Sequence, residues 1–369
     1  MLRKSSIICL ALFLLLSIKV EVNAAPYFST NFFCLADGET GQIIYAKGQD
    51  DKRAVASTTK MMTAILTVEY AGLDEVATIT EHADKTPEFT IGLRAGQQVE
   101  VGELLKVALI RSSNDAAVAL AEHVAGDERF FGHLMTKKAF AIGAVNTHFV
   151  NASGLPNQEH YSTAYDLSVI GRYLLTKKEP AQIVAMPQST FKHPGYREPL
   201  PIQNTNGLMW NYPGINGIKT GTTDLAGRCL VASATREGRS LIAVVLRSGD
   251  RNGDGRRLLD YGFNKAEYVK VIDKEQVFKQ LKVNNGDKPY VEVYPSQDVY
   301  LWQADIKLDI EKKVRMNYMV EAPINEGVKL GYLDVYANGK LVNSIALVSR
   351  ENINKNNKII NRIKEILIK

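Results

Sequence analysis

The chain has 369 residues, 23% of them charged, and a formal net charge of +5. Its length allows two domains with a sizeable core, and its composition is that of an ordinary soluble protein. The excess of positive charge is too small to indicate a nucleic-acid-binding protein, which usually carries a strongly basic domain, so we expect no nucleic acid among its partners.

The first 24 residues are arranged like a secretory signal peptide. Two basic residues, Arg3 and Lys4, precede an apolar run from Ile7 to Ile18, and small residues follow. The apolar run is too short to span a bilayer comfortably, which makes an uncleaved N-terminal anchor the weaker alternative. We therefore expect an exported protein whose mature chain begins near Ala25.

The cysteines and histidines give no sign of a metal site. The mature chain keeps Cys34 and Cys229, each in an apolar run that is typical of a strand. An exported protein can form disulfides, but two buried, unpaired thiols explain the pattern equally well, and the sequence leaves both open. The motifs CxxC and HExxH are absent and the six histidines lack metal-ligand spacing, so we expect no metal and no cofactor.

The first candidate for chemistry is a serine–lysine pair that follows two short strands predicted between Asn31 and Tyr45. Ser57 and Lys60 stand at the start of a helix predicted to run from Met61 to Tyr70, and their spacing of three residues puts them on one helix face. A helix N-terminus also favours an oxygen that becomes negative. The pair is therefore a candidate for a serine nucleophile whose base is an amine.

A simple helix cap is the alternative role for Ser57, since serine is a frequent N-cap residue. The spacing alone is not decisive, because Ser189 and Lys192 repeat it. That second copy runs into His193-Pro194-Gly195, which cannot continue a helix. Support for Ser57 as a nucleophile has to come from other parts of the chain.

A polar cluster interrupts the next helical stretch, which runs from Val101 to Val124. The cluster contains Ser112 and Asn114. A helix start, with Ser113 or Asn114 as its cap, is the alternative explanation. Further along, the sequence predicts a helix at residues 130–142, a strand and turn at 146–156, a helix at 161–175 and a loop-rich region at 180–213.

A third polar segment lies in a predicted strand. Residues 214–223 are β-prone and flanked by glycines, and they include Lys219, Thr220 and Gly221. Glycine in a strand often marks the close approach of a ligand or of another backbone. Two strands, at residues 229–235 and 240–247, and a helix at 255–263 are expected to follow.

The region from residue 273 to 350 has the pattern of short alternating strands, and Asn338-Gly339 is a strong hairpin signal. We predict that it is a separate β-rich domain, preceded by a first domain that spans residues 25–272. Its strands are expected at residues 290–294, 307–310, 315–320, 333–336 and 341–347.

The last segment, residues 355–369, is predicted to be an amphipathic helix. The segment holds five basic residues and one acidic residue, a net charge of +4. The apolar residues on one face are Ile359, Ile360, Ile363, Ile366 and Leu367. Such a helix is suited to an anionic membrane surface. A terminal helix that docks on its own protein is the alternative.

Three pieces stand in order along the chain: Ser57-x-x-Lys60, Ser112-x-Asn114 and Lys219-Thr220-Gly221. This trio occurs in β-lactamases and penicillin-binding proteins. Over nearly the whole mature chain, the sequence resembles the low-molecular-mass penicillin-binding proteins that are serine D-alanyl-D-alanine carboxypeptidases. Further stretches that carry the resemblance are Thr40-Gly41, Asn146-Thr147-His148-Phe149, Gly154-Leu155-Pro156 and Asn206-Gly207-Leu208-Met209-Trp210.

The resemblance implies an α/β (α+β) catalytic domain with an antiparallel sheet flanked by helices, followed by the β-rich domain and the terminal helix. It implies an enzyme on the outer face of the bacterial cytoplasmic membrane. This enzyme would remove the C-terminal D-alanine from peptidoglycan peptide stems, and β-lactam antibiotics would acylate it. The membrane surface, reached through the terminal helix, would be a further partner, and no cofactor is implied.

The resemblance also assigns roles to residues. Ser57 would be the nucleophile, Lys60 its base, and Ser112 a proton relay beside a second cation, Lys219. The backbone N–H groups of Ser57 and Thr222 would form the oxyanion hole. Arg251 is matched by its position before residues 258–263, and an ordinary surface arginine is the alternative for it. The residues expected to bind substrate are Asn114, Thr220, Gly221, Thr222, Thr223 and Arg251.

Three rival functions share the trio or the fold. A β-lactamase of class A needs a further glutamate for deacylation, and Glu159, Glu179 and Glu198 are the candidates, none of them in a recognisable motif. A DD-endopeptidase would differ only in its leaving group. A non-catalytic penicillin-binding sensor would have no need of the intact trio.

Overall fold

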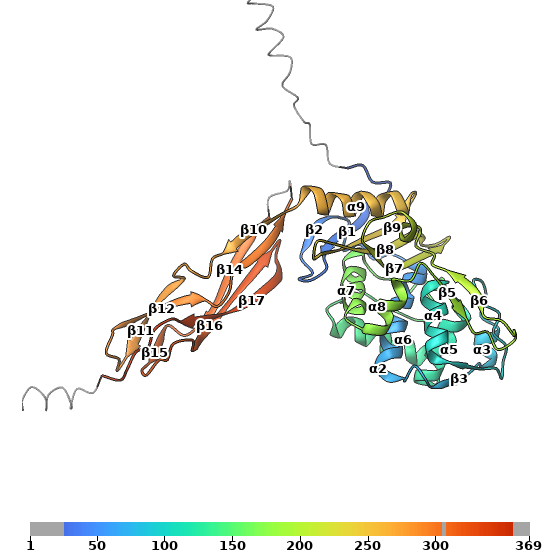
Figure 1. Ribbon diagram of the computed structural model, residues 1–369, viewed down its shortest axis with the longest axis horizontal. Helices are drawn as coiled ribbons and strands as arrows, with labels where there is room; N and C mark the ends of the chain where they lie inside the picture. Colours follow the sequence, from blue (N-terminus) through green and yellow to red (C-terminus); the bar gives the residue numbers. More distant parts are fainter. Residues whose placement is uncertain (1–25, 305–307, 357–369) are drawn as a thin grey trace, which may run out of the picture.

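The computed structural model describes residues 26–304 and 308–356, which form a helix-rich N-terminal part and an elongated, β-rich C-terminal part (Figure 1). The predicted signal peptide lies outside the described residues, as does the predicted terminal helix except for its first two residues. None of the helices in the described ranges is long and apolar enough to cross a membrane.

A five-stranded antiparallel sheet lies at the centre of the N-terminal part, in the order β2-β1-β9-β8-β7. Among the described strands, β7 pairs only with β8, so β7 forms one edge of the sheet. The sheet matches the antiparallel sheet predicted from the sequence. Its strands are β1 (Phe32–Asp37), β2 (Ile43–Lys47), β7 (Ile215–Thr223), β8 (Gly227–Arg236) and β9 (Arg239–Ser248).

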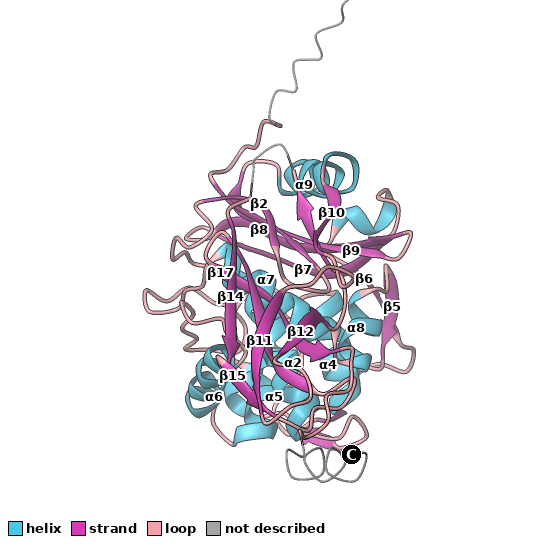
Figure 2. Cartoon of the chain, turned by 90° about the vertical axis from the view of Figure 1, so that its left-hand side faces the viewer, coloured by secondary structure: helices cyan, strands magenta, loops and turns pink. Residues whose placement is uncertain are grey.

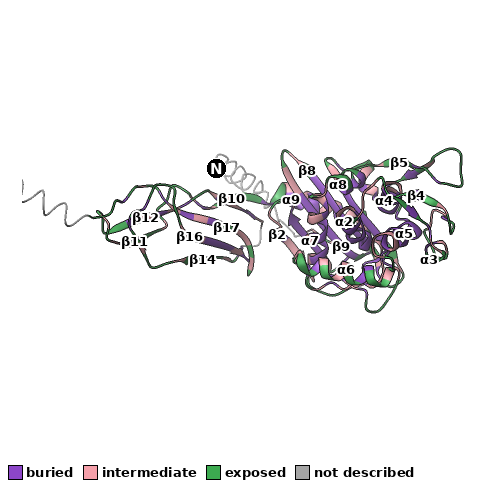
Figure 3. Ribbon diagram, turned by 90° about the horizontal axis from the view of Figure 1, so that it is seen from below, coloured by how far each residue is buried: buried purple, intermediate pink, exposed green. Residues whose placement is uncertain are grey.

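The helix α2 (Lys60–Tyr70) lies in the middle of the N-terminal part, and its first eight residues are all buried. A helix buried on all sides belongs to the core of a domain, and Figure 3 shows α2 among buried elements. The other elements around it are η1 (Ala56–Thr59), β3 (Val76–Thr78), α3 (Glu81–Asp84), β4 (Gln98–Glu100), α4 (Val101–Ile110), α5 (Asn114–Ala125), α6 (Glu128–Ala141), α7 (Ala164–Leu175), α8 (Lys178–Val184), β5 (Gln188–Phe191), β6 (Leu200–Gln203), η2 (Gly207–Trp210) and α9 (Arg251–Lys265).

The two faces of the sheet belong to two different apolar cores. Successive strand residues point to opposite faces, so Val231 and Val244 pack with α2, α5 and α7, whereas Leu230 and Val245 pack with α9. Figure 2 shows α9 on one side of the sheet and α7 and α2 on the other. Because both faces are covered, the middle residues of β8 and β9 are all buried and mostly apolar rather than alternately polar.

Two local predictions for the middle of the chain were wrong. Residues 146–151 do not form a strand, because a backbone N–H and the Thr147 hydroxyl donate to the Asp166 carboxylate and leave only an isolated bridge. Residues 180–213, predicted to be loop-rich, contain most of α8, the β5–β6 hairpin and η2. Ser189 lies in the strand β5. This agrees with the prediction that the second Ser-x-x-Lys copy is not at the start of a helix.

The C-terminal part is a six-stranded sheet in the order β14-β16-β17-β12-β11-β15, next to the pair β10-β13. The predicted strands at 290–294, 333–336 and 341–347 lie within β12, β16 and β17. The strands β10, β11 and β13 were not predicted. The bounds are β10 (Glu267–Ile272), β11 (Lys279–Asn284), β12 (Tyr290–Pro295), β13 (Val299–Gln303), β14 (Ile310–Met316), β15 (Met319–Glu321), β16 (Lys329–Ala337) and β17 (Lys340–Ser349).

Three details of the C-terminal part differ from the sequence prediction. Of the strand expected at 307–310, residue 307 lies outside the described residues and only Ile310 of the described ones belongs to β14. The strand expected at 315–320 is divided between β14 and β15. Residues 267–272 form the strand β10, which pairs with β13, although the predicted first domain extends to residue 272. Strand pairing thus groups β10 with the C-terminal part.

Trp302 of β13 joins the two parts of the chain. Its Nε1 donates to Asp37 Oδ2 at 2.8 Å, its backbone N–H donates to Gln42 Oε1 at 2.9 Å, and Gln42 Nε2 donates to Trp302 O at 2.7 Å. All three residues are buried. Because Asp37 and Gln42 lie beside β1 and β2, this contact is at the end of the strand order opposite β7.

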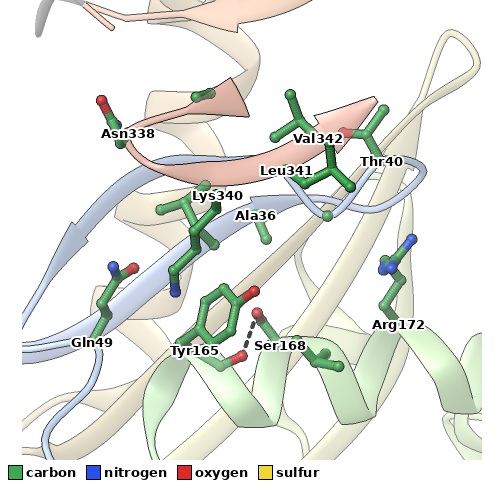
Figure 4. Close-up of a pocket in the computed structure, with 14 residues that line it drawn as sticks. Ala36, Thr40, Gln49, Tyr165, Ser168, Arg172, Asn338, Lys340, Leu341 and Val342 are labelled. Atoms are coloured by element: carbon green, nitrogen blue, oxygen red, sulfur yellow. Dashed lines mark hydrogen bonds between the residues drawn. The ribbon is translucent and has the colours of Figure 1, made fainter. Parts of the chain in front are cut away.

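A second contact encloses a polar cavity of about 120 Å³ between α7 and the β16–β17 hairpin (Figure 4). Lys340 Nζ lies 2.9 Å from the ring centroid of Tyr165 and 3.6 Å from the Asp50 carboxylate. Ser168 and Arg172 approach the same cavity from α7. The C-terminal part therefore contacts the N-terminal part along β1, β2 and α7, away from β7.

Candidate active site

Ser57 lies in a tight 3₁₀ turn, η1, that leads into α2. The residue before it, Ala56, has a φ of +49°, a left-handed conformation that costs an L-residue roughly 1–2 kcal/mol. Neither η1 nor α2 has a side-chain cap at its N-terminus, so Ser57 is not the helix cap that the sequence left as an alternative. Backbone strain of this kind is frequent at functional sites.

Lys60, the first residue of α2, is fully buried next to Ser57. Its Nζ lies 2.9 Å from Ser57 Oγ, 2.6 Å from Asn114 Oδ1 and 2.7 Å from the carbonyl oxygen of Ser153. Burial holds the pKa of Lys60 well below its usual value, and the charge of the nearby Lys219 adds to this effect. Burial therefore favours the neutral form of this amine over the ammonium.

A neutral lysine amine has two N–H groups and one lone pair. The oxygens of Asn114 and Ser153 can only accept, so they take the two N–H groups. As an ammonium, Lys60 also donates to Ser57 Oγ. As a neutral amine, it has its lone pair left for Ser57 Oγ and can accept the serine proton. This arrangement places a base within direct hydrogen-bond reach of the proton that a serine nucleophile has to lose.

Ser112 lies in the connection between α4 and α5, Ser113 is at the N-cap position of α5, and Asn114 is the first residue of that helix. Ser112 has a φ of +72°, again a strained conformation for an L-residue. Asn114 Nδ2 donates to two carbonyls of the loop formed by residues 87–93, and the Asp115 carboxylate accepts N–H groups of the same loop. The connection and the loop are therefore held together as one wall of the site.

The strand β7 forms the opposite wall and passes very close to Ser57. A Cβ atom on Gly221 would lie 2.9 Å from Ser57 N and 2.8 Å from Val55 O, so only glycine fits at this position. The close approach brings the edge strand next to the backbone N–H of Ser57. This confirms the close backbone approach that the glycine in the predicted strand indicated.

Lys219 of β7 is a second buried amine. It is 1% exposed, and its Nζ donates to Thr220 O at 3.1 Å. Burial lowers the pKa of Lys219 to about 7, with a further contribution from the positive charge of Arg251. The site therefore holds two amines, Lys60 and Lys219, of which the second changes its charge near neutral pH.

Arg251 faces β7 and not the solvent alone. It is the first residue of α9, and its Nη1 donates to Thr222 Oγ1 at 2.7 Å and to Gly221 O at 3.1 Å. The side chain of Asp250 caps the helix just before it. The alternative of an ordinary surface arginine is therefore wrong for Arg251.

A small cavity of about 90 Å³ opens over Ser57. Lys60, Asn114 and Lys219 are buried and not on its surface. Thr223 does not reach the cavity, because its Oγ1 accepts from Ala226 N at 3.1 Å. The residues that line the cavity are Ser57, Phe89, Arg111, Ser112, Thr205, Thr220, Gly221, Thr222 and Arg251.

The carboxylates that a β-lactamase would need are not at this cavity. Glu159, Glu179 and Glu198 are exposed, and none of them lines it. Asp115 and Glu128 are the acidic residues whose charges reach Lys60. Asp115 accepts N–H groups of the 87–93 loop, and Glu128 Oε1 accepts from the backbone N–H of Ala152 at 2.9 Å. The lining side chains are neutral or positively charged.

Thr205 and Ser153 belong to the site but carry no sequence signal of their own. Thr205 Oγ1 lies 2.6 Å from Thr220 Oγ1, and the Ser153 carbonyl holds Lys60. Ser153 directly precedes the Gly154-Leu155-Pro156 stretch noted in the sequence, which was the one available hint. Contacts between residues so far apart in the chain arise only when the fold brings them together.

His160 supports the turn that carries Ser57. Its Nε2 lies 2.8 Å from Thr59 Oγ1, and the Thr59 hydroxyl donates to the carbonyl of Ala56. His160 Nε2–H is therefore the donor, and the ring is neutral. Burial, aided by neighbouring positive charges, lowers the pKa of His160 to about 3, so this support persists at all physiological pH values.

The two cysteines are unpaired and buried in the sheet. Burial raises the pKa of the Cys34 thiol to about 12 and that of Cys229 to about 11, so neither is a reactive thiolate at neutral pH. In the ranges that the structure describes, no three His, Cys, Asp or Glu side chains are grouped so that they could hold a metal ion.

Two family descriptions match this chain in sequence. Residues 19–249 match the family described as D-alanyl-D-alanine carboxypeptidase (peptidase S11). Residues 267–355 match the family described as the C-terminal domain of penicillin-binding protein 5. The second match begins at the first residue of β10, in agreement with the strand pairing.

Individual proteins are similar over most of their length. The D-alanyl-D-alanine carboxypeptidase DacF of Bacillus subtilis is 32% identical over 87% of this chain and 85% of its own. DacA of Escherichia coli is 32% identical over 95% of this chain and 90% of its own. The crystal structure of penicillin-binding protein 5 from Haemophilus influenzae has a TM-score of 0.72 at 28% identity, covering 90% of this chain and 99% of the other.

Proposed function

This chain belongs to the D-alanyl-D-alanine carboxypeptidase family, and from that membership we propose that it removes the terminal D-alanine of peptidoglycan pentapeptide stems through an acyl-enzyme on Ser57. It is a serine-type peptidase. The observation that carries the proposal is the buried amine of Lys60, which lies 2.9 Å from Ser57 Oγ and whose pKa is lowered by burial. Hydrolysis would leave tetrapeptide stems and so limit cross-linking of the cell wall.

In the first step, Lys60 takes the hydroxyl proton while Ser57 Oγ attacks the carbonyl carbon between the two D-alanines. The oxygen of that carbonyl becomes negative, and the N–H groups of Ser57 and Thr222 are proposed to bind it. The position of Gly221 against Ser57 N supports this role, since it brings β7 next to the turn that contains Ser57. Breaking the C–N bond then releases the terminal D-alanine.

The leaving amine needs a proton, which Ser112 is proposed to relay from Lys60. Ser112 lines the cavity on the wall that Asn114 and Asp115 hold in place. Water then attacks the ester on Ser57, with Lys60 again as the base, and regenerates the enzyme. The neutral state of Lys60 is essential in both halves, because an ammonium cannot accept a proton.

The carboxylate of the substrate is proposed to bind between Arg251 and the hydroxyls of Thr220 and Thr222. Guanidinium–carboxylate contacts are among the strongest hydrogen bonds in proteins. The contacts of Arg251 with Gly221 and Thr222 support this assignment. Thr223 was expected to share this role, but we do not propose it, because its hydroxyl is bonded within the β7–β8 turn.

Asn114 is proposed to have two roles. Its Oδ1 orients Lys60, which was not expected from the sequence. The sequence also led us to expect a contact with the peptide group of the substrate. To make it, Asn114 Nδ2 would have to give up its hydrogen bonds to the 87–93 loop. We therefore propose that this loop takes part in substrate binding.

The test is the release of D-alanine from two substrates by the purified mature protein. We expect rapid release from a soluble pentapeptide stem and slow or no cleavage of a cross-linked dimer. Preferred cleavage of the dimer would favour the endopeptidase, and rapid turnover of penicillin would favour the β-lactamase. A protein that binds penicillin but cleaves neither peptide would be a sensor.

Export and membrane attachment are further parts of this proposal. The sequence of residues 1–24 supports secretion to the outer face of the cytoplasmic membrane, and residues 355–369 support peripheral attachment through an amphipathic helix. Removing residues 355–369 should abolish sedimentation with anionic lipid vesicles while D-alanine release in solution is retained. Binding that survives this truncation, or binding to neutral vesicles of equal strength, would contradict the attachment.

A further inference from the structure

Arg111 stands at the junction between α4 and the wall that holds Ser112. The backbone on either side of it is fixed, because Arg111 N donates to Val107 O at 3.2 Å and Thr205 N donates to Ile110 O at 3.2 Å. Ser112 follows directly. The side chain of Arg111 lines the cavity over Ser57 from the α4–α5 wall, whereas Arg251 lines it from the β7 wall.

The charge of Arg111 is not balanced by the protein. Among the described residues, no carboxylate pairs with its guanidinium, and no acidic side chain lines the cavity. Exposed arginines elsewhere do have partners, such as Arg94 with Asp84 and Arg350 with Glu275. Arg111 and Arg251 both face this small cavity, and neither guanidinium has a carboxylate partner among the described residues. Their charges create a positive potential that favours an anionic ligand.

Hydroxyl groups complete a set of donors for a carboxylate. Thr205 Oγ1 and Thr220 Oγ1 are 2.6 Å apart, and only one of the two hydroxyl hydrogens can be used in their mutual bond. The other is free to donate into the cavity. Together with Arg111 and Arg251, this hydroxyl forms a group of donors that matches a carboxylate with its two oxygens.

We propose that Arg111 is a specificity-determining residue that binds the terminal carboxylate of the leaving D-alanine, opposite Arg251. The inference rests on the proposed carboxypeptidase function and adds a residue to its substrate contacts. A larger cavity of about 460 Å³ continues past Arg111 toward Pro201 and Gln203. A substrate that ends at Arg111 keeps its carboxylate between the two guanidinium groups, whereas a longer chain would have to pass them.

The experiment compares two peptides that differ only at the C-terminus. One ends in D-Ala-D-Ala with a free carboxylate, and the other ends in D-Ala-D-Ala-amide, which lacks the negative charge. Both are tested with the wild-type protein, Arg111→Gln and Arg111→Lys. Arg129→Gln, on an exposed arginine of α6 that lines neither cavity, is the matched control for loss of one charge.

We expect Arg111→Gln to lower kcat/KM for the free acid about 10- to 100-fold, the range for a hydrogen bond to a charged group, mainly through KM. The loss for the amide should be at least tenfold smaller, so discrimination between the peptides falls. Arg111→Lys should recover part of the discrimination between the two peptides. Arg129→Gln should keep the wild-type ratio of kcat/KM for the free acid to kcat/KM for the amide. Unchanged melting temperatures show that the variants are folded.

An equal loss for both peptides, or no loss for either, would overturn the role of Arg111. These outcomes differ from failure of the proposed function, in which the wild-type protein would release neither D-alanine from the free acid nor D-alaninamide from the amide. A wild-type protein that cleaves the acid and amide equally well would also contradict the inference, because no carboxylate would then be recognised.

Discussion

The two parts of the chain differ in how many of their charged and polar side chains are buried. Near Ser57, the N-terminal part buries Lys60 and Lys219, each at most 1% exposed. In the described residues after 273, the buried polar side chains are only Asp334 and Ser349. Exposed side chains form ion pairs in this part, as for Arg350 with Glu275, and the buried Asp334 pairs with the exposed Arg315.

This difference separates a reactive region from a supporting one. A buried amine lowers stability unless it is neutral or paired, and natural proteins keep such groups mainly where function requires them. The strained residues Ala56 and Ser112 are in the same region as the buried amines. We therefore expect substitutions at the Ser57 cavity to change activity greatly, and substitutions in the C-terminal sheet to change stability slightly.

The largest effect is expected for Ser57→Ala. Without a nucleophile, kcat/KM for D-alanine release should fall at least about 10⁴-fold, and covalent labelling by penicillin should disappear. Ser189→Ala is the matched control, since Ser189 has the same spacing to a lysine but lies in β5. Persistent labelling of Ser57→Ala, or loss of activity in Ser189→Ala, would show that the wrong serine has been assigned.

Lys219→Met should separate activity from stability. We expect kcat/KM to fall about 10²- to 10³-fold as a cation of the site is lost, while stability rises by about 0.5–2 kcal/mol. The wild-type amine has a folded pKa of about 7, below its unfolded value, so wild-type stability increases with pH from about 7 to 10. The advantage of the variant in urea unfolding should therefore shrink over that range. A variant that is less stable at pH 6 would contradict this account.

Arg251→Gln tests the coupling between the two cations of the β7 wall. Removing this charge should lower kcat/KM about 10- to 100-fold through loss of a charged hydrogen bond. It should also raise the pKa of Lys219 above 7, because Arg251 now lowers it. The alkaline limb of kcat/KM, which reports groups of the free enzyme, should move to higher pH. A limb that stays in place would mean that Lys219 is not the group observed.

Asp334→Asn is expected to have the smallest effect. Arg315 donates to both Asp334 oxygens and lowers the pKa of Asp334 to about 2. The pair is partly exposed, so its loss should cost about 1 kcal/mol or less and leave D-alanine release unchanged. The stabilisation is present above pH 4 and is lost as pH falls toward 2. A large loss of activity would show that the C-terminal part contributes to the site.

The sequence was most informative where chemistry requires a fixed spacing. Ser57 and Lys60 are one turn apart, so local structure alone brings them together. Arg251 was chosen by its position in the sequence, and it contacts Gly221 and Thr222 of β7 at the cavity. Thr223 was assigned by its neighbours in the motif, but the turn after β7 uses its hydroxyl.

Contacts between distant residues could not be predicted from the sequence. The Ser153 carbonyl reaches Lys60 across 93 positions of the chain, and Trp302 meets Asp37 across 265. Neither type of contact has a local pattern, because every residue has a backbone carbonyl and the residues around Trp302 do not indicate which distant group accepts its indole N–H. The strand expected at 146–151 failed for the same reason, since Asp166 captures its hydrogen-bond donors.

The most direct test of the central claim is to locate the adduct that penicillin forms with the wild-type protein. Intact mass spectrometry followed by peptide mapping should find one β-lactam per chain, on the peptide that contains Ser57, and the adduct should persist for minutes. An adduct on any other peptide would contradict the assignment of Ser57 as the nucleophile, and so would the absence of an adduct in a folded protein.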